Sequence, residues 1–259
     1  MKPQDRHAAI LDLVREHRKV TVDYLADELD ASRETIRRDL TELSVRGQLR
    51  KYHGGATLLD EQTEGAFRSR LHEQSNEKRA IGRFAAKLFG ENDTLFVDTG
   101  TTTLAFAQEL ATRPSMTIVT NSLMITQTLA RSNQGHRVFL VGGEYRNDAS
   151  ENVGVLVVEQ IRKFNARDAV LTVGAIDEQG AMDYDLQEAE IARAMIDHAK
   201  RVTVLADSTK LNRTALFRVC TLDQVHRLIL NAPPEPDLAT ALREAGVEVL
   251  VANRDLGDS

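Results

Sequence analysis

Residues 98–103, Asp-Thr-Gly-Thr-Thr-Thr, have the composition of a turn that binds phosphate. A short apolar run at residues 94–97 precedes this segment, and a helical pattern begins near Thr103. Short hydroxyl side chains and the free amides at the start of a helix donate hydrogen bonds to phosphate oxygens, and glycine lets the anion approach the backbone. The segment therefore predicts non-covalent binding of an anion.

Polar side chains also follow other predicted strands. Asn121 begins a helical pattern, and Gly143 and Arg146 follow an apolar run at residues 137–141. Ligands of parallel α/β folds bind beyond the carboxyl ends of the strands, so we expect these groups to share one site. Three further candidates, Asp183, Asp185 and Glu188, offer carboxylates that can bind sugar hydroxyls. A fourth candidate, Lys210, offers a positive charge.

A structural interpretation of these turns stays open, because polar residues between strand and helix are common in α/β proteins. Lys210 could simply pair with Asp207 near the surface. Residues 149–154 place Glu151 and Asn152 just before a predicted helix, where they can alter ligand preference. Neither GxxxxGK[ST] nor GxGxxG occurs, which argues against nucleoside triphosphates and dinucleotides.

A second group of candidate binding residues lies in the first 57 residues. Ile36, Leu40 and Leu43 recur at the spacing of one buried helix face, which predicts a helix over residues 33–46. Two shorter helical patterns precede it, as in a helix-turn-helix. The outward face and the start of this recognition helix carry the candidate DNA contacts Ser32, Arg33, Glu34, Thr35, Arg37, Arg38 and Thr41. Arginine offers paired donors to guanine or phosphate.

Residues 48–56 predict a strand, a glycine turn and a basic wing, with the candidate DNA contacts Arg50, Lys51, His53 and Gly54. Residues 1–57 carry 11 Lys and Arg against 10 Asp and Glu, so the excess of negative charge in the chain lies beyond residue 57 and does not argue against a nucleic-acid partner for the first part. Exposed arginines also occur on ordinary solvated helices and in helical interaction modules. The turn spacing, the buried stripe and the basic wing together favour DNA.

These motifs resemble those of the DeoR family of metabolite-responsive repressors. The runs Ser-Arg-Glu-Thr-Ile-Arg-Arg-Asp-Leu at 32–40 and His-Gly-Gly-Ala at 53–56 resemble its DNA-binding signature, and the runs DTGTTT, TNS, GGEYR, DYD with EAE, and DSTK resemble its effector domain. The resemblance implies phosphorylated sugars or polyols as ligands and a fold related to ribose-5-phosphate isomerase and coenzyme A transferases. By position it assigns the phosphate to Asp98, Thr99, Gly100, Thr101 and Thr102. It assigns the rest of the effector to Asn121, Gly143, Arg146, Asp183, Asp185, Glu188 and Lys210.

Beyond residue 73, strand-like runs alternate with helical patterns. Seven such runs lie at 94–97, 116–119, 137–141, 169–173, 202–205, 226–230 and 247–251. This alternation predicts an α/β fold with a mainly parallel sheet that helices cover on both faces. We expect a winged helix-turn-helix domain at 1–57, a linker at 58–72, and a larger effector-sensing and oligomerisation domain at 73–259.

Composition excludes several classes of protein. No apolar run approaches the ~20 residues of a membrane span, and the first residues lack the pattern of an export signal. Cys220 is the single cysteine, so no intramolecular disulfide can form, as suits the cytoplasm. No cysteine and histidine cluster has metal-binding spacing, and we expect no cofactor.

The sequence therefore predicts a cytoplasmic, homo-oligomeric repressor of a carbohydrate or polyol operon. It would bind operator DNA, leave it when a phosphorylated sugar or polyol binds, and contact no membrane. An activator or dual regulator on the same scaffold stays open. So does an isomerase-type enzyme that uses Asp98, Asp177, Asp207 and Lys210 for acid-base chemistry.

Overall fold

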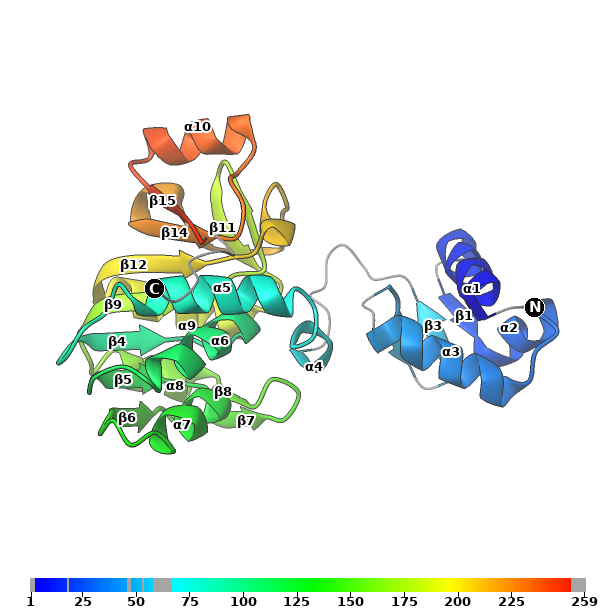
Figure 1. Cartoon of the computed structure of the whole chain (residues 1–259), viewed down its shortest axis with the longest axis horizontal. Coiled ribbons are helices and arrows are strands. Elements are labelled where there is room, and N and C mark those ends of the chain that lie inside the picture. Colours follow the sequence, from blue (N-terminus) through cyan, green and yellow to red (C-terminus); the bar gives the residue numbers. More distant parts are fainter. Residues whose placement is uncertain (1–2, 18, 46–47, 53, 58–66, 253–259) are drawn as a thin grey trace, which may run out of the picture. The chain divides into compact units, whose positions relative to one another are not determined.

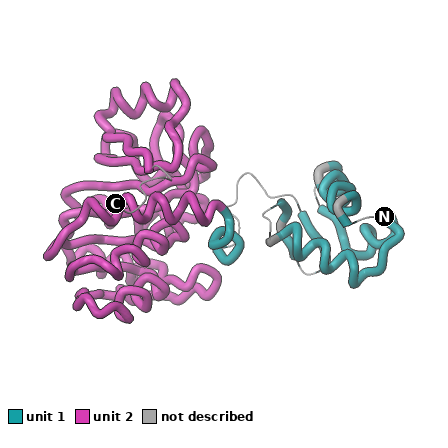
Figure 2. Tube along the Cα trace, in the orientation of Figure 1, with its two compact units in different colours: residues 1–73 teal, residues 74–259 magenta. Residues whose placement is uncertain are grey.

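The computed structural model describes residues 3–17, 19–45, 48–52, 54–57 and 67–252. The chain divides into two compact units, Met1–Glu73 and Gln74–Ser259, which Figure 2 colours separately. No helix in the described ranges is long and apolar enough to cross a membrane.

The described part of residues 3–57 in the first unit forms three helices and a small antiparallel sheet. Its elements are α1 (Pro3–His17), β1 (Lys19–Thr21), α2 (Val22–Glu28), α3 (Arg33–Val45), β2 (Arg50–Tyr52) and β3 (Gly55–Thr57). The strands pair in the order β1-β3-β2. Ile36, Leu40 and Leu43 of α3 are fully buried against apolar side chains of α1 and α2, because their spacing places them on one helix face. The predicted winged helix-turn-helix is confirmed.

Side-chain caps define the start of both helices of this motif. Thr21 Oγ1 accepts a hydrogen bond from Tyr24 N at 3.1 Å, and Ser32 Oγ accepts one from Thr35 N at 3.1 Å. Each hydroxyl satisfies an amide that the first helical turn leaves without a partner. Ser32 therefore fixes where α3 begins.

The second unit is built on a seven-stranded parallel sheet. Its strands are β4 (Thr94–Val97), β5 (Thr117–Thr120), β6 (Arg137–Leu140), β9 (Ala166–Leu171), β12 (Ala199–Leu205), β14 (Arg227–Leu230) and β15 (Glu248–Val251). They lie side by side in the order β15-β14-β12-β9-β4-β5-β6, and every pair is parallel (Figure 1). Each predicted apolar run forms one of these strands, so the expected α/β class and parallel sheet are confirmed.

Helices cover this sheet in two layers. They are α5 (Ser75–Ala86), α6 (Thr101–Leu110), α7 (Leu123–Ala130), α8 (Val155–Ile161), α9 (Leu186–Asp197) and α10 (Pro236–Glu244). Contacts join α5 to α6 and α6 to α7, whereas α8 contacts α9. A Cβ on Gly82 of α5 would lie 2.7 Å from Phe106 N, so glycine permits the close approach of α5 to α6.

The chain reverses its direction of travel across the sheet between β4 and β9. It runs outward from β4 through β5 to β6, then returns to the other side of β4 and continues through β9, β12, β14 and β15. At such a switch point the loops after adjacent strands separate and leave room for a ligand. The topology therefore places a candidate site beyond the ends of β4 and β9.

Two small β structures were not predicted from the sequence. The hairpin of β7 (Glu144–Arg146) and β8 (Glu151–Val153) follows β6, and β10 (Ala175–Asp177), β11 (Gly180–Asp183) and β13 (Phe217–Cys220) form a separate antiparallel sheet. Each strand has only three or four residues, too few to show an alternating apolar pattern. The 3-10 helices η1 (Ser208–Lys210) and η2 (Leu222–Gln224) complete the unit.

The predicted linker at residues 58–72 is described only in part. Residues 58–66 lie outside the described ranges, and the following segment forms a short helix, α4 (Phe67–Arg70). Phe67 is buried, and the Arg70 guanidinium lies 5.6 Å from the centre of its ring. This part of the expected linker is therefore ordered secondary structure.

Candidate functional sites

The outward face of α3 carries the side chains predicted to contact DNA. Glu34, Arg37, Arg38 and Thr41 are exposed, whereas Ile36 and Leu40 on the opposite face are fully buried. The predicted division of this helix into a buried and an exposed face is therefore confirmed. Ser32, Arg33 and Thr35 lie at its first turn, where backbone amides favour phosphate oxygens.

Weak ion pairs hold two of these arginines. Arg33 Nε lies 2.7 Å from Asp23 Oδ1, and Arg37 Nη1 lies 3.7 Å from Glu34 Oε2. All four side chains are more than half exposed, and pairs of this kind add little to stability. Both guanidinium groups can therefore leave their carboxylates for phosphate or for a base.

The wing is tied to the recognition helix. Lys51 Nζ donates to Thr41 Oγ1 at 2.7 Å, and Thr41 Oγ1 donates to Arg37 O at 2.7 Å. Gly54 turns the hairpin with φ of 96°, a conformation that favours glycine, and its carbonyl accepts from Val22 N at 2.9 Å. The Arg50 side chain and all of His53 lie outside the described residues.

A buried ion pair that sequence reasoning missed joins α1 to α3. Asp39 is 3% exposed and accepts from Arg6 Nε at 2.5 Å, from Arg6 Nη2 at 3.1 Å and from His7 Nε2 at 3.1 Å. Burial alone would raise the pKa of Asp39, but the hydrogen bonds and charges of Arg6 and His7 outweigh it and lower that pKa. Asp39 therefore positions the recognition helix and does not face DNA.

The switch point of the parallel sheet holds the residues predicted to bind phosphate. Asp98 follows β4, and both of its carboxylate oxygens accept from Thr172 N, which follows β9, at 3.1 and 3.0 Å. A Cβ on Gly100 would lie 2.0 Å from Thr172 Cγ2, so only glycine fits between the two loops. Thr101 and Thr102 are buried at the start of the ten-residue helix α6.

The β7–β8 hairpin forms the opposite wall. Its backbone is fixed to the start of α7 by hydrogen bonds from Leu123 N to Ser150 O and from Asn152 N to Asn121 O, both at 2.9 Å. Asn121 Nδ2 donates to Glu151 Oε2 at 3.3 Å and to Asn152 O at 3.2 Å. Gly143 is equally constrained, because a Cβ there would lie 2.5 Å from Val153 O. This wall brings Glu151 into the site.

Arg146 of the hairpin faces several carboxylates. Its Nη1 lies 3.0 Å from Asp185 Oδ2, 3.7 Å from Glu188 Oε1 and 3.9 Å from Glu151 Oε1. Burial opposes its charge, but the carboxylates outweigh burial and raise the pKa of Arg146. Asp185 also caps α9, because its side chain accepts from Gln187 N at 2.8 Å. The hairpin and α9 are thus linked through one guanidinium.

Two buried carboxyl groups of this cluster resist ionisation. Burial raises the pKa of Glu151 to about 7, although Arg146 lowers it. Burial also raises the pKa of Asp98 well above its usual range, and the charges of Asp183, Glu188 and Glu151 add to the effect, against the Thr172 amide. The cluster therefore holds more carboxyl groups than its cation can neutralise.

Three buried polar atoms in this cluster have no hydrogen-bond partner in the described part of the chain: Thr99 Oγ1, Asn121 Oδ1 and Glu151 Oε1. Buried polar groups in native proteins almost always have partners, and an unpaired one costs about 1–3 kcal/mol. These atoms are therefore positioned for a ligand or for ordered water.

Most of the predicted effector residues interact with one another, whereas Lys210 is assigned to the site by its position at the edge of the sheet. Charge interactions and hydrogen bonds connect Asp98, Asn121, Arg146, Asp183, Asp185 and Glu188. Lys210 is half-buried in η1 and follows β12, at the same carboxyl edge of the sheet. Sequence reasoning gave no role to Thr172 and treated Glu151 only as a local variation, although its place before a helix start was a usable signal.

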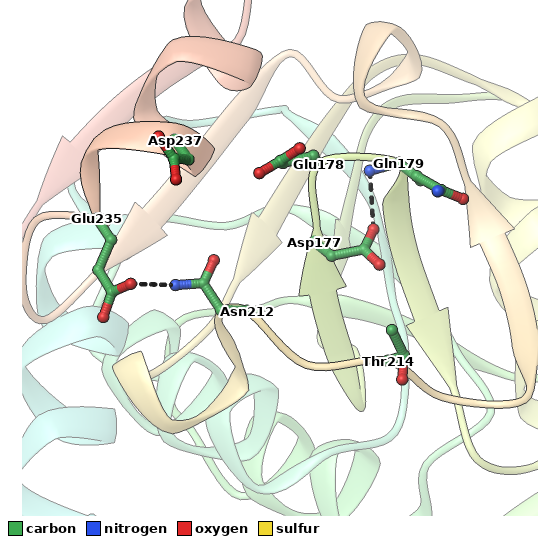
Figure 3. A pocket seen from close by; sticks show the side chains of 7 residues that line it. All are labelled: Asp177, Glu178, Gln179, Asn212, Thr214, Glu235 and Asp237. Carbon is green, nitrogen blue, oxygen red and sulfur yellow. Dashed lines mark hydrogen bonds between the residues drawn. The ribbon is translucent and has the colours of Figure 1, made fainter.

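A pocket of about 350 Å³ is lined by none of these predicted residues (Figure 3). It is lined by Asp177, Glu178, Gln179, Asn212, Thr214, Glu235 and Asp237. Asn212 Nδ2 donates to Glu235 Oε2 at 2.8 Å, and Asp177 Oδ1 accepts from Gln179 N at 2.8 Å. Across the described residues, no group of three or more His, Cys, Asp or Glu could hold a metal ion.

Two family models match this chain. The DeoR-like helix-turn-helix domain matches residues 6–62, and the DeoR C terminal sensor domain matches residues 73–232. The chain is 32% identical over 251 residues to the HTH-type transcriptional repressor CsqR of Escherichia coli (strain K12), covering 96% of each chain.

Other relatives match at similar levels. The Glycerol-3-phosphate regulon repressor of Escherichia coli is 30% identical, covering 96% of this chain and 99% of the relative. The HTH-type transcriptional repressor GlcR of Bacillus subtilis (strain 168) is 31% identical, covering 99% of both. Ribose 5 phosphate isomerase A from Neisseria gonorrhoeae overlaps with a TM-score of 0.37 and 16% identity, over 52% of this chain and 53% of that chain. At so low a TM-score the overlap supports no inference about function.

Proposed function

The chain belongs to the DeoR family of transcriptional regulators, and we propose that it represses a carbohydrate or polyol catabolic operon until a phosphorylated metabolite releases it. The matched domains are those of a DNA-binding regulator with a sensor, not of an enzyme. Relatives named as repressors, one of them of a glycerol-3-phosphate regulon, support repression over activation and a phosphorylated effector.

The recognition step rests on the exposed face of α3. Arg37 and Arg38 point away from the buried stripe, so they can reach base edges or phosphates when α3 lies in the major groove. Ser32, Arg33 and Thr35 at the helix start contact the sugar-phosphate backbone. Lys51 extends the contact from the wing, together with Arg50, His53 and Gly54. Helix-turn-helix proteins commonly bind paired half-sites, which supports a homo-oligomer.

The sensing step rests on the cluster at the switch point. The start of α6, with Thr101, Thr102 and Gly100, receives the phosphate, because the first amides of a helix and short hydroxyl groups donate hydrogen bonds to phosphate oxygens. The carboxyl groups of Asp183, Asp185 and Glu188 accept hydrogen bonds from hydroxyls, Arg146 closes the site, and Lys210 extends it. The observation that carries this proposal is the set of three buried, unpartnered polar atoms at this point.

Release requires that the effector bind better to the form of the protein that cannot hold the operator. A ligand with equal affinity for both forms would shift nothing. A 100-fold loss of operator affinity corresponds to a coupling free energy of about 2.7 kcal/mol. We further propose that the protein works in the cytoplasm, where phosphorylated intermediates of sugar use are produced.

A thermal-shift panel tests the sensing step. The probes are glycerol 3-phosphate and glucose 6-phosphate, galactose 6-phosphate and fructose 1-phosphate, each beside its unphosphorylated parent. A ligand at 100 times its Kd stabilises the native state by about 2.7 kcal/mol. We expect a rise in Tm with at least one ester and none with its parent. Equal responses to ester and parent, or no response in the panel, would contradict a phosphate-specific sensor.

A further inference from the structure

Thr99, Asn121 and Glu151 each have a buried side-chain atom without a hydrogen-bond partner, and Glu151 interacts with both of the other two side chains. Asn121 is 2% exposed and Glu151 is 1% exposed, so bulk water does not satisfy them. The side chains of Thr99 and Glu188 interact with the Glu151 carboxyl group and lower its pKa, so both lie close to it. Neither Thr99 Oγ1 nor Glu151 Oε1, however, has a hydrogen bond of ordinary distance and angle. The native fold therefore retains three unsatisfied atoms in one place.

The orientation of the Asn121 amide is fixed by its neighbours. Its nitrogen donates to two acceptors, Glu151 Oε2 and Asn152 O, so rotating the amide would bring oxygen against oxygen. Asn121 Oδ1 must therefore be the unsatisfied atom, and an amide oxygen can only accept a hydrogen bond. The same contact occupies Glu151 Oε2 and leaves Oε1 as the open carboxyl oxygen.

The nearby cation does not remove this demand for a donor. Arg146 Nη1 lies 3.9 Å from Glu151 Oε1, beyond hydrogen-bond distance, and bonds instead to Asp185 at 3.0 Å. A phosphate dianion carries acceptors only, so at this position it would face the acceptor Asn121 Oδ1 and, whenever Glu151 is ionised, the negative charge of a buried carboxylate. The phosphate end of an effector does not belong here.

We propose that Thr99, Asn121 and Glu151 form a donor subsite, which selects effectors that place a hydroxyl or ammonium group against these three atoms. The subsite rests on the proposed function, because it names the part of the effector that lies away from the phosphate. It moves Thr99 from the phosphate site, and it adds Glu151 as a specificity-determining residue. Hydroxyl and ammonium groups share the required chemistry, since both donate hydrogen bonds.

The replacement of Thr99 by valine tests the subsite with little risk to folding. The two side chains have nearly the same shape, and the hydroxyl that is lost has no protein partner. Thr203→Val is the matched control, because Thr203 Oγ1 is also buried and unpartnered but lies within β12. Calorimetric titration of the full chain measures Kd for glycerol 3-phosphate and glucose 6-phosphate, and for the 2-deoxy and 2-amino analogues of glucose 6-phosphate.

We expect Thr99→Val to weaken the binding of a responding ester about threefold to tenfold, the effect of one lost neutral hydrogen bond. Thr203→Val should leave Kd unchanged. Neither variant should lower the Tm of the unliganded protein, because each removes a buried hydroxyl group that has no hydrogen-bond partner. If the Thr99→Val and Glu151→Gln variants both bind every ester with the Kd of the wild type, the donor subsite is overturned. The proposed function as a phosphate-responsive repressor would then still stand. A wild type that binds none of the esters would overturn the proposed function, and the donor subsite with it.

Glu151→Gln separates the two kinds of donor. Glutamine keeps an acceptor oxygen but loses the charge, so binding of a hydroxyl should weaken less than tenfold and binding of an ammonium group tenfold or more. A compound without a donor at that position should bind both proteins equally. A larger loss for the 2-deoxy analogue than for its parent would contradict the subsite.

Discussion

Asp39 in the DNA-binding unit and Glu151 in the sensor unit are both nearly inaccessible, at 3% and 1% exposed, but their surroundings differ. Both oxygens of Asp39 meet Arg6 and His7, and their hydrogen bonds and charges lower its pKa in spite of burial. Burial raises the pKa of Glu151 to about 7, and one of its oxygens has no hydrogen-bond partner in the described structure. The satisfied carboxylate holds two helices together, whereas the unsatisfied one is available to a ligand.

The contributions of Asp39 and Glu151 to folding stability should change with pH in opposite directions. The folded pKa of Asp39 is lowered, so its contribution to stability is present above its unfolded pKa and is lost as pH falls through the folded value. The folded pKa of Glu151 is raised, so its contribution is present at low pH and is lost as pH rises toward about 7. Asp98 acts in the same direction as Glu151.

The largest effect is expected from Asp39→Asn. This change removes the buried carboxylate charge to which the Arg6 guanidinium donates, and breaking a buried pair costs about 3 kcal/mol. Scanning calorimetry should show the DNA-binding unit unfolding at much lower temperature while the sensor unit keeps its transition. Glu34→Gln is the control, because Glu34 is exposed and only loosely paired. An Asp39→Asn protein that melts like the wild type would remove the structural role of the ion pair.

The next largest effects are expected from Arg37→Ala and Arg38→Ala. These changes should weaken the binding of operator DNA and leave the stability of the fold unchanged. Each lost base contact should weaken operator affinity about tenfold to 100-fold, or roughly 1–3 kcal/mol. Fluorescence anisotropy with DNA selected from a random pool measures this loss, and Arg83→Ala in the sensor unit, also exposed, is the control. Unchanged affinity in both variants would show that α3 is not the recognition helix.

Glu151→Gln should change the free energy of unfolding by a smaller amount, on the order of 1 kcal/mol. The change should be stabilising, whereas Asp39→Asn is destabilising. The wild type must hold a buried negative charge at pH 8, so the variant should then be the more stable of the two. At pH 5 the wild-type carboxyl group carries a proton and the difference should nearly vanish. Urea unfolding of the ligand-free protein at both pH values measures it, and a variant less stable at pH 8 would contradict the account of this carboxyl group.

Sequence reasoning predicted the framework well because the framework depends on periodicity. The stripe of Ile36, Leu40 and Leu43 identified α3, and β-branched runs identified the strands of the parallel sheet. The hairpin β7–β8 was missed because three-residue strands carry no usable period. Its position depends on backbone hydrogen bonds to α7 that no local pattern encodes.

The residues of the candidate sites were predicted less completely than the helices and strands. Asp98, Asn121 and Arg146 were expected to share a site because each follows a strand of the parallel sheet, and the structure brings them together. The partners of Asp39 lie 32 and 33 residues away in sequence, so its role was not visible from its own helix. The burial of Glu151 depends on how the hairpin folds over the site, which the residue types alone do not reveal.

An effector bound at the switch-point cluster should release the operator, and a titration of the operator complex measures this release. Fluorescence anisotropy of the full chain on its selected DNA is measured with the ester that raises Tm and with the unphosphorylated parent. We expect the ester to weaken operator binding at least tenfold and the parent to leave it unchanged. An ester that raises Tm but leaves operator affinity unchanged would contradict the account.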